Sequence, residues 1–275
     1  MVTSTVEVCV CVKRVPMVGG SIVVTPDEQD VDTSMAGFTV SPHEECAVEE
    51  AVRIVERLGG RAGGSVTVLT LGPASAADQL RDMLALGANR AILLQTDGSE
   101  WGPVATAAAL ASVVGGRGSA DLGGRPPGAP RWDLLLFGNE AADTGGYQVP
   151  VRVAHALGLP CVTGIKRLDI SGESGRIAAG REYAGVEETF ELPLPAVVSV
   201  KEGINLPRYP SLPGRLRAKR APIETIEVGA APPGGLNKRR LTVPAASGSR
   251  AEVLGSGVEA VPALVRVLDE LGVLR

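Results

Sequence analysis

The fold is decided by the stretch Leu134-Leu135-Leu136-Phe137-Gly138-Asn139-Glu140-Ala141-Ala142-Asp143-Thr144-Gly145-Gly146-Tyr147-Gln148-Val149. Its apolar start predicts a buried strand that ends at Gly138, and a helical pattern from Val149 ends at Gly158. The small-residue loop between them would direct backbone N–H groups and the positive end of a helix dipole toward an anion. The alternative is an ordinary turn in which Asp143 or Thr144 caps the helix.

Strand and helix patterns alternate along the rest of the chain. Val6–Val12, Val66–Leu71 and Arg90–Leu94 are β-rich apolar runs. Between the first two, Ser41 as N-cap, Pro42 at the first helical position and Glu44 closing a capping box predict a helix. This alternation favours an α/β fold with a Rossmann-like, doubly wound and mostly parallel sheet, of the type that binds adenine nucleotides.

Such sheets bind ligands at the carboxyl ends of their strands. We therefore expect Lys13, the helix start at Ser41, the turn after Leu71 and the loop around Asp143 to meet in one crevice. The sequence lacks a complete G-x-G-x-x-G, so the convergence of several strand ends carries this prediction.

Composition excludes several classes of protein. Of the 275 residues, 44% are hydrophobic, and the net charge is −4. An acidic chain of this kind does not favour a nucleic-acid surface, and its apolar runs are too short to span a membrane. We see no signal-peptide pattern, and the four cysteines are too few and too oddly spaced for a disulfide framework or a zinc site. Cys9 and Cys11 alternate on a strand pattern, which favours buried core thiols. We expect a cytoplasmic location.

The last third of the chain changes character. The segment 167–191 suggests antiparallel strands, and 205–213 carries three prolines followed by basic residues. We expect a nucleotide-binding domain over 1–200, a recognition loop and basic segment over 201–228, and a C-terminal arm and helix over 229–275. The arm either packs on a partner subunit or folds back on its own domain. A Gly/Pro-rich insertion at 115–130 is expected to form a surface loop.

Catalytic patterns are scarce. The two histidines are His43, at a predicted helix start, and His155, inside a predicted helix. No G-x-S-x-G, P-loop, H-E-x-x-H or C-x-x-C signature occurs. We therefore predict a nucleotide-binding protein with no catalytic residues and no metal site of its own.

Several segments together resemble the beta subunit of electron transfer flavoproteins. They are Val10–Val15, Ala47–Arg53, Gly72-Pro73, the Asp143–Val149 loop, Leu194–Val198 and Asn205–Leu212. The resemblance extends from about residue 6 to the final helix. It implies a heterodimer with an alpha subunit that holds most of an FAD, and a structural AMP in the beta subunit. Electrons would arrive from flavin dehydrogenases such as acyl-CoA dehydrogenases and leave to the respiratory chain or another acceptor.

The crevice and the resemblance together predict the cofactor-binding residues. They are Cys11, Lys13, Ser41, Pro42, His43, Glu44, Leu71, Gly138, Asp143, Thr144, Gly145, Gly146, Gln148 and Val149.

The resemblance also implies partner-binding residues. Glu182 matches a glutamate that pairs with an arginine of the mobile flavin domain; it could equally be a solvated strand carboxylate. Arg208, Tyr209, Leu212 and Arg217 match the family's recognition loop, in which Leu212 is the anchor for the partner dehydrogenase. Local packing of Leu212 on Tyr209 is the alternative.

The chain also departs from the family. Val18 and His43 stand where members often carry aromatic residues near the flavin edge, and a charge on His43 could influence which reduced flavin is favoured. Two other functions stay open. One is an electron-bifurcating relative with a second FAD and NADH oxidation, and the other is a free-standing nucleotide-binding stress-type protein.

Overall fold

A computed structural model describes residues 5–17, 19, 22–115, 132–171, 175–233, 235, 238–244 and 252–274. The expected insertion at 115–130 lies outside these ranges except for Gly115, and so does Val18.

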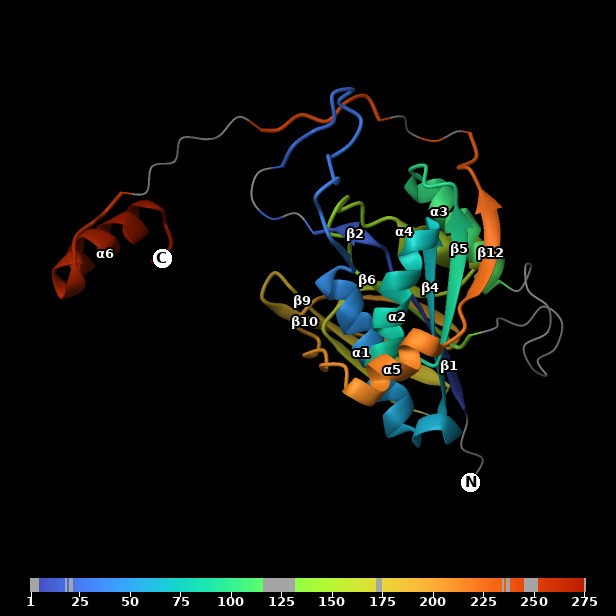
Figure 1. Ribbon diagram of the computed structural model, residues 1–275. Helices are drawn as coiled ribbons and strands as arrows, with labels where there is room; N and C mark the ends of the chain where they lie inside the picture. Colours follow the sequence, from blue (N-terminus) through green and yellow to red (C-terminus); the bar gives the residue numbers. More distant parts are fainter. Residues whose placement is uncertain are drawn as a thin grey trace.

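The centre of the molecule is a seven-stranded sheet in the order β12-β5-β4-β1-β6-β11-β7 (Figure 1). Every neighbouring pair in it is parallel. The predicted α/β fold with a doubly wound, Rossmann-like sheet is confirmed. The strands are β1 (Val6–Cys11), β4 (Gly64–Gly72), β5 (Arg90–Thr96), β6 (Leu134–Gly138), β7 (Cys161–Ile165), β11 (Ala196–Val200) and β12 (Glu224–Gly229).

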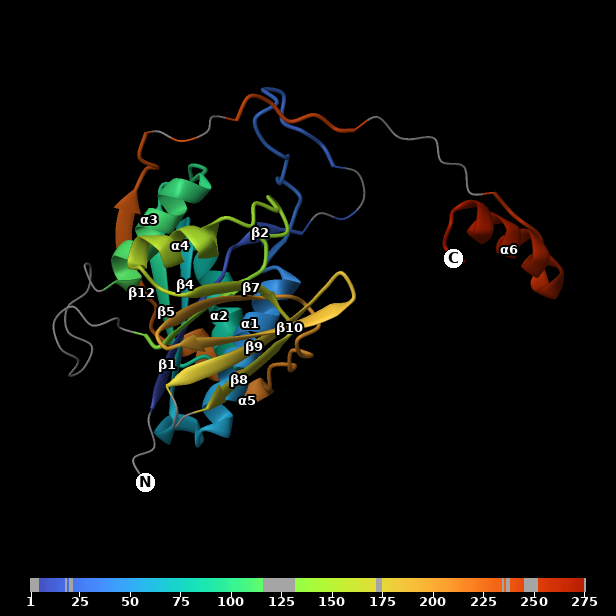
Figure 2. The same ribbon diagram turned by 180° about the vertical axis from the view of Figure 1, so that it is seen from behind.

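Helices cover both faces of this sheet (Figures 1 and 2). On one face lie α1 (Pro42–Arg57), α2 (Ala77–Leu86) and α5 (Leu212–Arg220). On the other lie α3 (Pro103–Val114) and α4 (Val149–Leu157). Strand β1 shows the division: Val8 and Val10 enter the core under α1 and α2, whereas Cys9 and Cys11 enter the core under α3 and α4. The prediction that these two cysteines are buried core thiols is confirmed.

The helix ends follow the local sequence signals. Helix α1 begins at Pro42, where the Glu44 carboxylate accepts a hydrogen bond from Ser41 N at 3.1 Å. Helix α4 ends before Gly158, which has a φ of 65° that a residue without Cβ adopts at little cost. Short 3-10 helices occur at η1 (Gly60–Ala62) and η2 (Ala74–Ala76).

Two smaller sheets accompany the main one. The predicted antiparallel segment forms β8 (Arg167–Ser171), β9 (Arg176–Tyr183) and β10 (Val186–Pro193), in the order β10-β9-β8. Strands β2 (Val15–Pro16) and β3 (Phe38–Thr39) pair beside α1.

The structure adds regular elements to the segment 201–228. We expected only a recognition loop and a basic segment there, but it carries α5 and β12, and β12 pairs with β5 in the main sheet. The sheet therefore extends beyond residue 200. Beyond it, η3 (Gly257–Ala260) and α6 (Val261–Glu270) stand apart from the body in both views (Figures 1 and 2). Within the described ranges, no helix combines the length and the apolarity needed to span a bilayer.

Candidate functional site

The crevice at the carboxyl end of the sheet lies where the winding direction reverses. Strands β1 and β6 are neighbours, with Cys11 opposite Phe137. The chain leaves β1 toward α1 on one face and leaves β6 toward α4 on the other. The two connections diverge at this point, and such a switch point is the usual ligand position in a doubly wound sheet.

The start of α1 packs tightly against the end of β6. A Cβ atom added at Gly138 would lie 2.6 Å from Glu44 Cγ and 3.1 Å from His43 Cβ. Only glycine therefore lets the helix start approach the strand end this closely. This contact brings Ser41, Pro42, His43 and Glu44 into the crevice, as predicted.

Glu44 is a buried carboxylate that ties two chain segments together. Its Oε1 accepts from Lys13 N at 3.0 Å, and its Oε2 accepts from Ser41 N. Burial raises the pKa of Glu44 to about 8, although these hydrogen bonds and the charge of Lys13 act in the opposite direction. Glu44 therefore links the segment after β1 to the start of α1 at the carboxyl end of the sheet.

The loop after β6 is held by side chains from both neighbouring segments. Lys13 Nζ lies 2.8 and 2.7 Å from the two Asp143 oxygens, and Ser41 Oγ accepts from Ala142 N at 2.8 Å. The N-cap of α4 is Gln148. The alternative in which Asp143 or Thr144 caps this helix is therefore wrong.

Beyond Asp143 the loop leaves donors free. Within the described chain, the N–H groups of Gly146, Tyr147 and Gln148 form no hydrogen bond, and a Cβ at Gly146 would meet nothing within 4 Å. Gly145 and Tyr147 have φ values of 53° and 55°, left-handed conformations of the kind found in anion-binding turns. These groups precede α4, whose second residue, Pro150, has no N–H to offer.

His43 faces Glu140 from the other side of the crevice. His43 Nδ1 accepts from Glu202 N at 2.7 Å, so the proton of the neutral ring lies on Nε2, 3.4 Å from Glu140 Oε1. Glu140 also bonds the Tyr147 hydroxyl, which raises the pKa of Tyr147.

Two further predicted residues line the end of the sheet. Cys11 is buried at the end of β1, and its thiol contact with Cys9, together with burial, raises the pKa of Cys11. Leu71 lies half-buried near the end of the neighbouring strand β4. The structure thus brings Cys11, Lys13, Ser41–Glu44, Leu71 and Gly138–Val149 to one edge of the sheet.

The expected partner-binding residues lie elsewhere. Arg208 sits on the outer side of α1, where its guanidinium bonds Glu49 and Glu56. Tyr209 and Leu212 are 94% and 71% exposed, so local packing of Leu212 on Tyr209 is excluded. Arg217 lies in α5, and Glu182 lies opposite Glu187 in the β9–β10 hairpin.

Three residues with structural contacts at these sites were not predicted from the sequence: Glu140, Tyr147 and Glu49. Glu140 and Tyr147 stand inside the quoted loop, but nothing local to the loop indicates that Glu140 meets His43. Glu49 is followed by Arg53 at helical spacing, a pattern that usually marks a solvated surface pair rather than a buried cluster.

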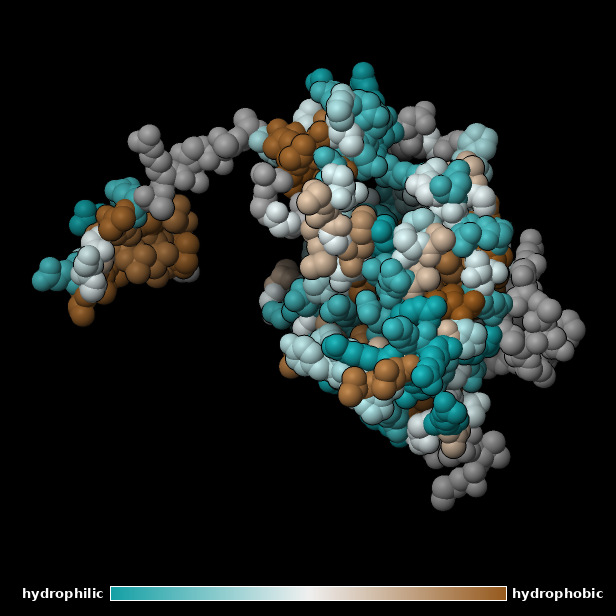
Figure 3. Space-filling model, viewed as in Figure 1, coloured by the Kyte–Doolittle hydropathy of each residue, from teal (hydrophilic) through white to brown (hydrophobic). Residues whose placement is uncertain are grey.

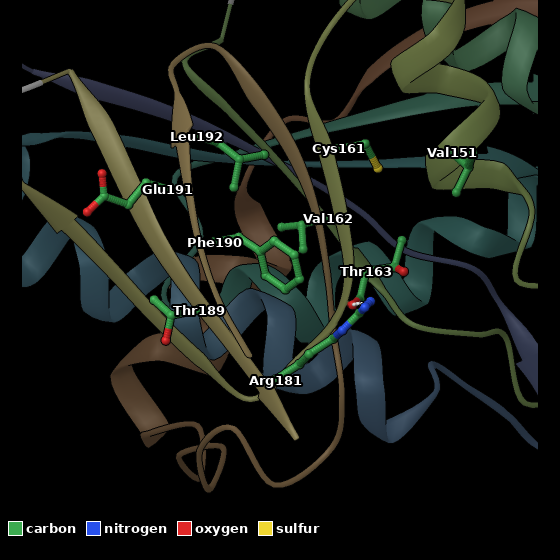
Figure 4. Close-up of a pocket in the computed structure, with 9 residues that line it drawn as sticks. All are labelled: Val151, Cys161, Val162, Thr163, Arg181, Thr189, Phe190, Glu191 and Leu192. Atoms are coloured by element: carbon green, nitrogen blue, oxygen red, sulfur yellow. Dashed lines mark hydrogen bonds between the residues drawn. The ribbon is translucent and has the colours of Figure 1, made fainter. Parts of the chain in front are cut away.

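A separate cleft of about 530 Å³ runs beside the edge strand β7 (Figure 4). Phe190 lies on its floor, and the Arg181 side chain reaches across to Thr163, with Nη1 3.5 Å from the carbonyl oxygen. Arg181 thus covers part of a sheet edge. None of the predicted site residues lines this cleft.

The fold and crevice define a doubly wound α/β protein of the nucleotide-binding type. The family described as "Electron transfer flavoprotein domain" matches residues 31–231. The chain is 34% identical to the electron transfer flavoprotein subunit beta of Bacillus subtilis over 70% of this chain and 68% of the relative. It is 35% identical to that of Syntrophomonas wolfei, over 82% and 81%. It is 34% identical to the mitochondrial subunit beta of Arabidopsis thaliana, over 81% and 82%. The chain belongs to the electron transfer flavoprotein family and is a beta subunit.

Proposed function

We propose that this beta subunit binds a structural AMP in the crevice and, together with an alpha subunit, holds one FAD. The heterodimer takes electrons from flavin dehydrogenases such as acyl-CoA dehydrogenases and passes them to the respiratory chain or another acceptor. The observation that carries the proposal is the crevice between β1 and β6, with its loop of unpaired N–H groups at Gly146–Gln148.

The crevice fits a nucleotide monophosphate. The free N–H groups, the open space at Gly146 and the start of α4 suit a phosphate, which needs several donors and no nearby bulk. Lys13 adds a positive charge, although Asp143 now neutralises it. Phosphate binding would compete with Asp143 for Lys13. Leu71, half-buried near the end of β4, offers an apolar surface to a base.

The flavin would supply the redox chemistry, accepting and releasing electrons in single steps. This chain's residues would position it. His43, held by Glu202 and Glu140, presents a ring of fixed orientation. By the family resemblance this residue lies toward the flavin edge, and Glu182 contacts the flavin domain of the alpha subunit.

Two surfaces support partner binding. The apolar side chains of α6 are exposed, and they gather on one side of the helix (Figure 3). We assign this helix to the alpha subunit. Tyr209 and Leu212, with Arg208 and Arg217, form the docking site for the dehydrogenase, where exposed apolar side chains stand on an anchored backbone.

Leu212→Ala tests the docking assignment. Electron transfer from an acyl-CoA dehydrogenase of the same organism should show a KM for the flavoprotein raised about tenfold, the usual cost of losing an anchor side chain. FAD content and heterodimer formation should stay unchanged. Val104→Ala is a matched control, because Val104 is also an exposed apolar residue but lies in α3, outside the predicted recognition loop and basic segment at 201–228. Equal effects of both variants, or loss of the heterodimer in Leu212→Ala, would contradict the assignment.

A further inference from the structure

An acidic hairpin, residues 23–32, projects from the body beside the C-terminal arm. Its strands meet at the bridge between Val24 and Val31, and its turn is closed by Glu28 N donating to Thr25 O at 2.8 Å. Thr25 Oγ1 donates to Asp27 Oδ1 at 2.6 Å, a bond that lowers the pKa of Asp27. These local bonds close the hairpin, in which none of the residues 23–32 is buried.

A basic arm, residues 238–241, lies against this hairpin. Lys238 Nζ donates to Gln29 O at 2.6 Å, and Gln29 Nε2 donates to Arg239 O at 3.0 Å. Leu241 N donates to Glu28 O at 2.7 Å, and Lys238 also pairs with Glu100. The arm and the hairpin are more than 200 residues apart in the sequence, and both side-chain and backbone hydrogen bonds join them.

The charges of the two segments are complementary. The hairpin contains Asp27, Glu28, Asp30 and Asp32, whereas the arm contains Lys238, Arg239 and Arg240. After the Thr25 bond, the charge of Lys238 also contributes to lowering the pKa of Asp27, an attraction that weakens with salt.

Apolar side chains surround this contact and face solvent. Ile22, Val23 and Met35 flank the hairpin, and Val243 follows the arm. Figure 3 shows hydrophobic residues gathered at the top of the body on the side toward α6. The apolar side of α6 is likewise uncovered, and none of its residues is buried. A single partner protein bound on this side would cover the apolar side chains beside the hairpin (the hairpin flank), the arm and α6 together.

We propose that the acidic hairpin is an assembly element that holds the basic arm and directs α6 onto the alpha subunit, which also covers the hairpin flank. The inference rests on the proposed heterodimer. The relatives are named as beta subunits, and the arm ends in the uncovered apolar face of α6, so the occupant is a different subunit. By fixing the arm before association, the hairpin lowers the ordering cost of binding.

The test compares the double variant Gln29→Ala/Lys238→Ala with Arg240→Ala. Arg240 is a neighbouring basic residue for which the described chain shows no hydrogen bond or ion pair, so it controls for lost charge. Hydrogen exchange is measured at the Leu241 amide in the full-length chain alone. The double variant should exchange about tenfold faster than the wild type, as expected for the loss of two side-chain hydrogen bonds, and the control should not. Raising NaCl from about 50 to about 500 mM should accelerate exchange in the wild type as well.

The second measurement is the dissociation constant of the complex with the alpha subunit of the same organism. The double variant should bind about tenfold more weakly, mainly through a slower association with an unfixed arm. Unchanged exchange at Leu241 would show that the hairpin does not hold the arm and would overturn the inference. Faster exchange with unchanged affinity would also overturn it, because the contact would then have no role in assembly. If the wild type forms no heterodimer, the proposed function itself fails. The exchange measurement on the isolated chain still tests the contact between hairpin and arm, so the two failures can be told apart.

Discussion

Removing the Arg208 guanidinium should destabilise the protein far more than removing another basic side chain of the same segment. Glu49 is only 1% exposed and accepts four hydrogen bonds: one from Arg53, one from Arg208 N, and two from the Arg208 guanidinium. Arg208→Ala removes the last two. The variant leaves a buried carboxylate with half of its partners.

The magnitude follows from that count. Removing one partner of a buried ion pair costs about 3–5 kcal/mol when the remaining charge has no other partner. Glu49 keeps two of its four donors, so we expect about 2 kcal/mol at this residue. Glu56, the second carboxylate on Arg208, is exposed and adds less than about 1 kcal/mol. The expected loss in the free energy of unfolding is about 2–3 kcal/mol.

Urea unfolding at pH 7 measures this loss, with Arg217→Ala as the control for charge. Arg217 lies exposed in α5 and should change the free energy of unfolding by less than about 0.5 kcal/mol. Burial would raise the pKa of Glu49, but the bonds from Arg208 and Arg53 outweigh burial and lower it. The stabilisation is therefore present above the ordinary carboxylate pKa and is lost as pH falls, so the two variants should converge in acid. Equal effects of both variants at pH 7 would refute the reasoning.

Three further outcomes are expected. Gly138→Ala should lower the free energy of unfolding by about 1–3 kcal/mol, because its Cβ would overlap Glu44; a thermal melt unchanged from wild type would contradict the packing. For Glu44→Gln, the free energy of unfolding should rise relative to wild type as pH increases from 5 to 8, by up to about 1.4 kcal/mol per pH unit. The reason is that the raised pKa makes ionised Glu44 destabilising in the folded wild type. Unfolding curves whose difference does not vary with pH would contradict that pKa. His43→Ala should speed hydrogen exchange at the Glu202 amide, because it removes the ring nitrogen that accepts from Glu202 N; unchanged exchange at that amide would contradict the contact.

Sequence patterns predicted those features, such as helix ends, that are set by residues close together in the chain. Ser41, Pro42 and Glu44 marked the start of α1, and Gly158 marked the end of α4. The convergence of Lys13 and Asp143 was also predictable, because strand ends of a parallel sheet meet at one edge. The alternation of strands and helices therefore sufficed for the fold class, and the convergence of strand ends sufficed for the position of the candidate site.

Contacts between distant segments escaped prediction. Arg208 and Glu49 are 159 residues apart, and neither shows in its own segment that the other is near. Strand β12 is short and follows a proline-rich segment, so its pairing with β5 had no local signal. The positive φ of Tyr147 is a strained exception for a bulky residue, held by its surroundings rather than by its own preference.

The central claim is that the crevice binds AMP and that the FAD belongs to the complex. The most direct test is denaturing extraction of nucleotides from the purified chain, alone and co-expressed with its alpha subunit, with identification by mass spectrometry. We predict one AMP per heterodimer and one FAD that appears only in the complex. Two FAD and no AMP would support the bifurcating alternative, and ATP or no nucleotide on a stable isolated chain would contradict the account.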